Sequence, residues 1–204
     1  MKTLIAVPCM QQVDANFAQC LAALRKVGEC TVAFQISSLV YDSRNHLAEL
    51  AVKGEYDYIL WLDSDMVFAP DILERLMADI EGKDMVSGLY FRRTAPYTPV
   101  AYQTLTRDKG VLTVKDLKEY PKDIFEVEGV GFGAVLMRTD FLFEMPGGWF
   151  TPTPDAGEDC AFCIRFREHG FKIHVDPTIP IGHVGYVVVT ESLYRMVKED
   201  VGRG

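Results

Sequence analysis

Short apolar runs alternate along the chain with segments of helical periodicity. Runs at Thr3–Val7, Thr31–Ile36 and Tyr58–Leu62 predict strands, and the last is apolar at every position, as in a central strand covered on both faces. Between them, the apolar spacing predicts helices over Asp14–Val27 and from Ser43 to about residue 52. Strands that alternate with helices are typical of an α/β fold with a mostly parallel central sheet flanked by helices.

The second half continues this alternation after one interruption. Its predicted elements are a helix over about 70–82, a strand at Met85–Ser87, a strand at Gly133–Met137, a helix at Glu158–His169 and a strand at Lys172–Val175. Between Tyr90 and Pro121, prolines and dispersed charges leave only short strand-like pieces, around Val100–Gln103 and Val111–Val114. This stretch predicts a small antiparallel excursion over one edge of the sheet.

Composition narrows the class of protein. The 204 residues predict a single domain over 1–204, and a net charge of −8 disfavours a sequence-independent grip on the nucleic-acid backbone. No apolar stretch approaches the roughly 18 residues of a membrane span. Five unevenly spaced cysteines indicate reduced thiols, so we expect a cytoplasmic protein without a membrane anchor. The close pair Cys160 and Cys163 is typical of core-facing residues, with a redox or zinc motif as the alternative.

The sharpest local motif is Asp63-Ser64-Asp65, which directly follows the apolar run Tyr58–Leu62. Residues two apart in an extended chain point to the same side, and open α/β sheets bind ligands beyond the carboxyl ends of their strands. Two carboxylates without a neighbouring Cys or His suit a hard divalent cation, Mg²⁺ or Mn²⁺, that is shared with phosphate oxygens. The alternative is a solvated acidic turn.

Two further polar features lie downstream. Glu158 and Asp159 open a predicted helix after a loop rich in proline and glycine. The alternative for these acids is ordinary charge complementarity with the helix dipole. His183 lies between Gly182 and Gly185, where backbone can approach a ligand closely, and a structural histidine is the alternative.

In their order, these features resemble the glycosyltransferases of the GT-A fold, particularly its family 2-like members. The resemblance is carried by a strand that ends at Pro8, Ser43-Arg44-Asn45, Trp-Leu-Asp-Ser-Asp at 61–65, Gly-Glu-Asp at 157–159, and His183. It implies a single-domain, metal-dependent enzyme that moves a sugar from a nucleoside-diphosphate-sugar, a UDP-sugar above all, to an acceptor hydroxyl. It also implies a donor-binding half at about 1–89, an acceptor-side half at about 90–187 and a helical tail at about 188–204.

The resemblance assigns roles to five side chains. It implies that Asp65 is the direct ligand of Mn²⁺ or Mg²⁺, that Asp63 contacts the ribose or the metal, and that His183 is a late third ligand. It implies that Asp159 is the catalytic base facing the acceptor hydroxyl and that Glu158 orients the acceptor or the base. One metal site and one separate acid suit inverting transfer, while a retaining reaction at the same metal site stays open.

The other expected donor and cofactor contacts are Pro8, Cys9, Arg44, Ser64, Gly133 and Trp149. By the resemblance, Pro8 and Cys9 end the first strand where the nucleotide base is cradled. Arg44 would reach the diphosphate, with a surface helix cation as the alternative. Gly133 would let backbone approach the donor sugar. Trp149 would be a platform for an acceptor sugar, with a loop aromatic that packs on the core as the alternative.

Other classes of function stay open. A nucleotidyltransferase on a related fold would want a glycine-rich phosphate loop after the first strand, and residues 8–12 contain no glycine. A non-catalytic metal- or sugar-binding module would not need Asp159. The expected partners are a nucleotide-sugar and a saccharide or other hydroxyl acceptor. A modified DNA base is disfavoured by the net charge, although four cations offer a local patch: Arg92, Arg93, Arg107 and Lys109.

Overall fold

The computed structural model describes residues 1–185 and residue 191. Its helices are α1 (Ala15–Ala23), α2 (Val40–Lys53), α3 (Ile72–Asp79), α4 (Phe141–Glu144) and α5 (Glu158–Glu168). Its strands are β1 (Lys2–Cys9), β2 (Glu29–Ile36), β3 (Tyr58–Leu62), β4 (Met66–Phe68), β5 (Met85–Gly88), β6 (Ala101–Asp108), β7 (Val111–Asp116), β8 (Phe125–Val127), β9 (Gly129–Val130), β10 (Ala134–Arg138), β11 (Ile173–Asp176) and β12 (Ile181–His183). The expected tail at about 188–204, apart from Glu191, lies outside the described residues, as do 186 and 187 of the expected acceptor-side half.

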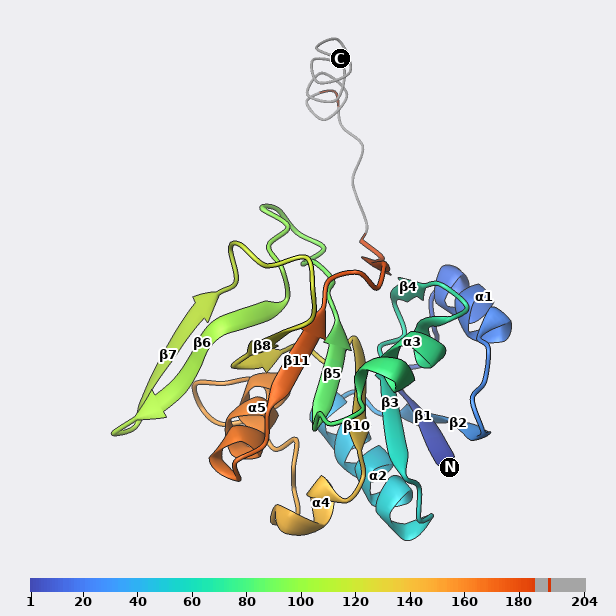
Figure 1. The fold of residues 1–204 in the computed structure, drawn as a ribbon, viewed down its shortest axis with the longest axis horizontal. Helices are drawn as coiled ribbons and strands as arrows, with labels where there is room; N and C mark the ends of the chain where they lie inside the picture. The colour runs from blue at the N-terminus through green and yellow to red at the C-terminus, as the bar shows by residue number, and fades with distance from the viewer. Residues whose placement is uncertain (186–190, 192–204) are drawn as a thin grey trace.

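A seven-stranded sheet forms the centre of the molecule, in the order β2-β1-β3-β10-β5-β11-β8 (Figure 1). Strands β1, β2, β3, β5 and β11 run in one direction, while β10 and β8 run the opposite way. The predicted mostly parallel sheet is therefore confirmed. The antiparallel entry of β10 between β3 and β5 was not predicted, and it brings the first residue of β10 to the edge where β3 ends.

Helices cover both faces of this sheet because successive strand residues point to opposite sides. On β3, Ile59 and Trp61 belong to the core that includes buried residues of α2 and α5. Leu60 and Leu62 belong to a second core that includes buried residues of α1 and α3. All four side chains have no exposed surface, as the uniformly apolar run predicts.

The predicted antiparallel excursion is present as a three-stranded sheet in the order β7-β6-β9. Strands β6 and β7 project as a ribbon from one side of the molecule (Figure 1). They are joined by Lys109 and Gly110, whose φ angles are +48° and +81°. Positive φ at both central residues is the requirement of the tight hairpin turns that match the twist of paired strands, which explains the glycine.

Helix α1 is shorter than predicted. It ends at Ala23, four residues before Val27, and Leu24 has an extended backbone. The next residue, Arg25, donates its backbone N–H to the Pro70 carbonyl at 2.8 Å and pairs with Glu74 of α3. Contacts with a distant segment therefore end the helix before Gly28 does.

The structure describes the surroundings of the cysteines and the character of the helices. All five cysteines are free thiols. Cys163 is buried, its Sγ donates to the Val130 carbonyl, and burial raises its pKa, so its surroundings favour a core role over a reactive or zinc-binding one. In the part of the chain that the structure describes, no helix combines the length and apolar character needed to cross a bilayer.

Candidate functional site

The Asp63-Ser64-Asp65 motif lies at the carboxyl edge of the sheet, directly after β3. The chain does not stay extended there, because the Met66 N–H donates to the Asp63 carbonyl and closes a turn. The two carboxylates therefore face different partners. Asp63 accepts from Arg44 Nη2 at 2.8 Å, and Asp65 accepts from Arg93 Nη1 at 2.7 Å. Within the described residues, no three His, Cys, Asp or Glu side chains are grouped as a metal would require.

His183 lies beside Asp65 because β12 pairs with β4. Its Nδ1 lies 2.9 Å from the Phe91 carbonyl oxygen, which can only accept, so Nδ1 carries a proton and donates it. Its Nε2 lies 3.4 Å from Asp65 Oδ2. The structure thus brings two of the three expected metal ligands together. The hydrogen bond to Phe91 fixes the orientation of the ring, as a backbone carbonyl does for many metal-bound histidines.

The electrostatics of these groups follow from burial and pairing. Burial raises the pKa of Asp63, and Arg44 only partly opposes this. Burial also tends to raise the pKa of Asp65, but the hydrogen bond and charge of His183, with the charge of Arg93, lower it below its usual range. Asp65 in turn raises the pKa of His183. Of the two carboxyl groups, Asp65 is therefore the one whose ionised form is favoured, which is the form that binds a cation.

Arg44 is buried rather than exposed, with 2% of its surface accessible. The alternative of a surface helix cation is therefore wrong. Besides Asp63, it approaches Glu158 of α5, with Nε 3.5 Å from Oε1. Arg44 thus joins two acidic motifs that are far apart in the sequence, and in this structure it contacts these acids rather than presenting itself to a diphosphate. Arg44 precedes the buried Leu47 and Ala51 by three and seven residues, so the helical spacing places it on the buried face of α2.

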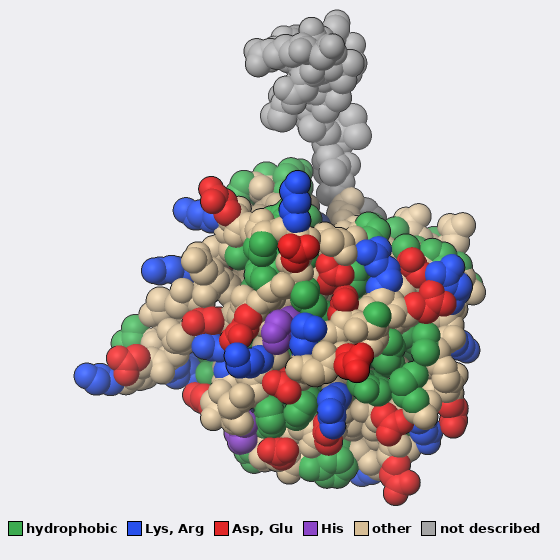
Figure 2. Space-filling view, viewed as in Figure 1, with side chains coloured by type: hydrophobic (Ala, Val, Ile, Leu, Met, Phe, Trp, Pro, Cys, Tyr) green, Lys and Arg blue, Asp and Glu red, His purple; other side chains and the backbone are tan. Residues whose placement is uncertain are grey.

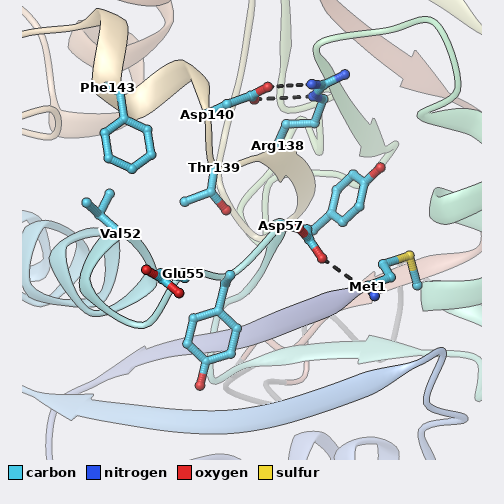
Figure 3. Close-up of a pocket in the computed structure, with 10 residues that line it drawn as sticks. Met1, Val52, Glu55, Asp57, Arg138, Thr139, Asp140 and Phe143 are labelled. Carbon is cyan, nitrogen blue, oxygen red and sulfur yellow. Dashed lines mark hydrogen bonds and ion pairs between the residues drawn. The ribbon is translucent and has the colours of Figure 1, made fainter.

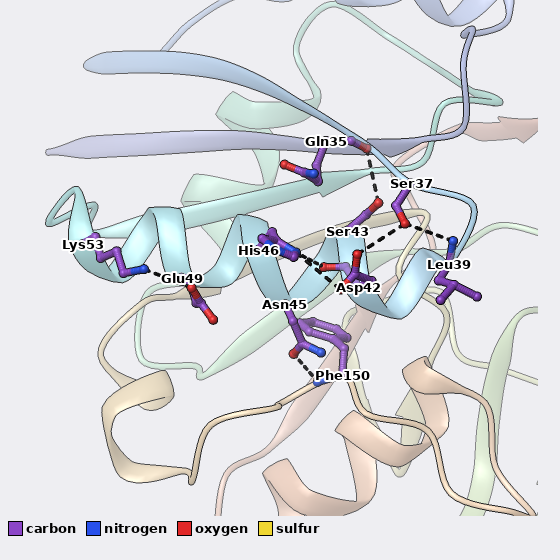
Figure 4. Close-up of polar contacts among 10 residues, drawn as sticks. All are labelled: Gln35, Ser37, Leu39, Asp42, Ser43, Asn45, His46, Glu49, Lys53 and Phe150. Atoms are coloured by element: carbon purple, nitrogen blue, oxygen red, sulfur yellow. Dashed lines mark hydrogen bonds and ion pairs between the residues drawn. The ribbon is translucent and has the colours of Figure 1, made fainter.

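The neighbours of Arg44 in α2, Ser43 and Asn45, form hydrogen bonds with other segments (Figure 4). Helix α2 begins at Val40, so Ser43 is not its N-terminal cap. The Ser43 hydroxyl instead donates to the Gln35 carbonyl at 3.3 Å, and Asn45 Oδ1 accepts from the backbone N–H of Phe150 at 3.0 Å. One helical turn therefore links the end of β2 to the loop that precedes α5.

Glu158 and Asp159 open α5, as predicted, with Gly157 at the N-terminal cap position. Gly157 offers no side chain to cap the helix, and Asp159 Oδ1 accepts from the N–H of Cys160 at 2.7 Å. Against the opposing effect of its burial, the charges of both acids, together with that of Asp63, raise the pKa of Arg44. The acidic helix start is thus linked through Arg44 to the end of β3.

A cavity of about 610 Å³ opens beside Asp65. Ser64, Asp65 and Arg93 form one wall, and Val184 follows β12 at its rim. Its remaining lining comes from the segments after β1 and at the end of β2: Met10, Gln11, Gln12, Val13, Asp14, Ile36, Ser37 and Ser38. These residues were not singled out from the sequence. The signal that finds them is the same strand-end argument that found Asp63, applied to β1 and β2.

The other expected donor contacts have varied surroundings. Pro8 is buried and Cys9 half-buried at the end of β1, next to the segment that lines the cavity. Gly133 is buried, and a side chain there would collide with Tyr90, whose hydroxyl accepts the Gly133 N–H at 3.1 Å. Trp149 packs on the core and donates its indole N–H to Leu142 at 3.0 Å, which favours the alternative of a loop aromatic. The packing of Gly133 and Trp149 accounts for both residues without a ligand.

Comparison with solved structures identifies the architecture. A197 from STIV is 22% identical over 90% of this chain and 86% of its own, with a TM-score of 0.65. A GalNAc-T7 glycosyltransferase, solved with UDP, GalNAc and Mn²⁺, is 12% identical over 97% of this chain, with a TM-score of 0.62. These likenesses support a distant GT-A-like fold for the chain. The chain spans 48% of the GalNAc-T7 chain, and no protein-family model and no curated protein sequence matches it.

A second cavity, of about 690 Å³, lies at the opposite edge of the sheet, where β1 and β3 begin (Figure 3). Four of its charged groups form two ion pairs, Arg138 with Asp140 and Asp57 with the amino group of Met1. None of the expected site residues lines it. In a GT-A-like fold the carboxyl edge is where strand ends converge, so we assign the candidate site to the smaller cavity.

The cations around this edge are mostly paired with acids. Arg92 pairs with Asp116, Arg93 with Asp65, and Arg107 with Asp155. On the face drawn in Figure 2, acidic and basic side chains intermingle rather than forming a field of one sign. Three of the four cations considered as a patch for DNA are thus paired with acids, while Lys109 lies in the turn between β6 and β7, and a DNA acceptor stays disfavoured.

Proposed function

We propose that the chain is a metal-dependent glycosyltransferase that moves a sugar from a nucleoside-diphosphate-sugar to an acceptor hydroxyl with inversion. The observation that carries the proposal is the pairing of Asp65 with His183 at the carboxyl edge of a GT-A-like sheet, where Asp65 lines a cavity of about 610 Å³ and Arg44 joins the neighbouring Asp63 to Glu158. A UDP-sugar is the expected donor, and a saccharide or other hydroxyl compound is the expected acceptor. The resemblance to a glycosyltransferase solved with UDP and Mn²⁺ supports this choice.

Two of the three expected ligands, Asp65 and His183, are arranged so that they could share a divalent cation. Asp65 Oδ2 and His183 Nε2 are 3.4 Å apart, the separation of two atoms that share an ion at about 2.1 Å from each. The proton on His183 Nδ1 is committed to Phe91, so the lone pair of Nε2 is free when the ring is neutral. Diphosphate oxygens and water would complete the shell, as is usual for Mg²⁺-type sites. When bound, the cation neutralises the charge that develops on the leaving diphosphate.

The charge balance also suits one divalent ion. Four carboxylates, those of Asp63, Asp65, Glu158 and Asp159, outnumber the guanidinium groups of Arg44 and Arg93 and the imidazole of His183 that face them. Like charges this close repel one another, and a divalent cation would offset that repulsion. We propose that Asp159 takes the acceptor proton and that Glu158 orients the acceptor, because a hydroxyl must lose its proton as it attacks.

A donor panel tests the proposal. UDP-glucose, UDP-N-acetylgalactosamine, GDP-mannose and dTDP-glucose are incubated with the protein and Mn²⁺, and nucleotide release and thermal shift are recorded. We expect at least one donor to be hydrolysed slowly and to stabilise the protein only when metal is present. A nucleotidyltransferase would instead release pyrophosphate from nucleoside triphosphates and sugar phosphates, and a binding module would show a thermal shift without turnover.

Arg93 gives a prediction about metal binding alone. It holds the Asp65 oxygen that the cation would take, and it is 52% exposed, so the two cations compete for one ligand. Arg93→Ala should raise the affinity for Mn²⁺ alone by about threefold, the scale of a partly exposed ion pair. Arg92→Ala is the matched control because Arg92 pairs with Asp116 instead. Calorimetric Mn²⁺ titration of both variants decides it, and equal affinities would place the metal away from Asp65.

A further inference from the structure

Arg44 is a buried cation, and some of its hydrogen-bond donors have no acceptor. Of its guanidinium nitrogens, Nη2 bonds Asp63, while Nε and Nη1 have no hydrogen-bond partner among the described residues. Aromatic rings surround it, with ring centroids of Trp61, Phe132 and Phe150 at 5.7, 5.4 and 5.9 Å from its Cζ atom. Ring faces attract a cation but do not replace the hydrogen bonds that water gave it. Packing and stability therefore do not account for an arginine here.

The two acids that Arg44 faces belong to opposite parts of the proposed site. Asp63 leads into Asp65, the proposed metal ligand, through a single residue. Glu158 immediately precedes Asp159, the proposed base, and its Oε1 is 3.5 Å from Arg44 Nε. A small approach of Glu158 would turn this ion pair into a hydrogen bond and satisfy one of the spare donors. Arg44 is thus in contact with both acidic motifs at once.

We propose that Arg44 is a positioning residue that sets the distance between the metal-binding strand end and the start of the acidic helix. Through Asp63 it fixes Asp65, and through Glu158 it fixes Asp159, so it determines how closely the leaving diphosphate and the attacking hydroxyl are brought together. This inference rests on the proposed function. Arginine suits the task because its planar fork reaches two carboxylates with defined geometry, whereas lysine offers one point charge.

The prediction separates turnover from donor binding. Arg44 contacts neither reactant, so Arg44→Met should lower kcat by about 10²-fold, the scale of a small misplacement of reacting groups. The affinity for UDP with Mn²⁺, measured by calorimetry, should change by less than about threefold. Arg44→Lys keeps the charge and one contact, so it should recover about tenfold of the lost kcat. Turnover is measured with the best donor of the panel above.

Two controls separate positioning from a general loss of structure. Arg25→Met removes an arginine that also faces two acids, Glu74 and Asp71, but is exposed and remote, and it should leave kcat unchanged. In a Glu158→Ala background, Arg44→Met should lower kcat by clearly less than it does in the wild type, because one of the two acids through which Arg44 acts is already gone and only Asp63 remains. Urea unfolding of each variant shows whether it is folded at the assay temperature. If Arg44→Met does not fold, kcat is compared instead for Arg44→Lys and for the double variant Arg44→Met with Glu158→Ala, which lacks both charges.

The outcomes are distinct. If wild-type protein turns over a donor and Arg44→Met does so at the wild-type rate, Arg44 does not position the acids. A parallel fall in kcat and in UDP–Mn²⁺ affinity would make Arg44 a donor-site residue and would also overturn the inference. If no donor of the panel binds or reacts with the wild-type protein, the proposed function itself fails, and the inference falls with it.

Discussion

Replacing Asp159 by asparagine is expected to slow sugar transfer by about 10²–10⁴-fold, the usual contribution of a general base. Asparagine keeps the shape of the side chain and can still accept from the Cys160 N–H, so α5 should begin at the same residue. What is lost is the ability to take the acceptor proton. The affinity for UDP with Mn²⁺ should stay near that of the wild type, because Asp159 faces the acceptor in the proposed site.

Asp155→Asn is the matched control for this change. Asp155 lies in the loop before α5 and pairs with Arg107 and Thr153, so its substitution perturbs the same segment without touching the proposed base. Steady-state kcat and calorimetric UDP–Mn²⁺ affinity are compared for the two variants. Transfer at the wild-type rate by Asp159→Asn would leave Asp159 as an acid at a helix start, and another base would have to be found.

Asp65→Ala is expected to weaken metal-dependent nucleotide binding by about 10²-fold or more. Asp65 is the carboxylate that the structure places 3.4 Å from His183 Nε2. Losing a charged ligand should lower the affinity at least as much as losing a group that hydrogen-bonds to a ligand, for which 10–100-fold is typical. The fold should survive, because Asp65 is partly exposed at a strand end and outside both hydrophobic cores. Calorimetry of UDP with and without Mn²⁺ measures the effect.

The metal-free titration is an internal reference for this prediction. UDP alone should bind Asp65→Ala as weakly as it binds the wild type, or slightly better because one negative charge near the phosphates is gone. Asp71→Ala, which removes an acid that pairs with Arg25 away from the cavity, should behave as wild type in both titrations. Wild-type affinity of Asp65→Ala in the presence of Mn²⁺ would remove Asp65 from the metal site.

Much of the central sheet was predictable because its strands carry their own signal. The run Tyr58–Leu62 is apolar at every position, since both faces of β3 are covered, and the structure confirms its bounds. Strands β4, β8, β9 and β12 have only two or three residues, and they are strands because distant segments pair with them. No periodicity can show in so short a run. The start of α2 was missed because the position of Ser43 suits a cap, while its hydroxyl bonds to β2 instead.

The candidate site divides in the same way. The acids after β3 and at the start of α5 were predictable, because strand ends and helix starts place side chains by rule. The direction in which Asp63 and Asp65 point was not, because it depends on a turn and on two arginines from other segments. The proton of His183 Nδ1 is assigned by a carbonyl, that of Phe91, which no sequence pattern reveals.

The reversed strand β10 has a consequence for how the protein is made. Its residues Ala134–Arg138 separate β3 from β5, so the edge of β3 and one edge of β5 are completed only by a strand that leaves the ribosome much later. The other edge of β5 is completed by β11, at Ile173–Asp176. The expected donor-binding half therefore cannot form its full sheet during synthesis of its own segment. The central sheet is therefore complete only when the segments of both halves have been synthesised. Such long-range pairing makes folding slow compared with that of a chain whose strands pair in order.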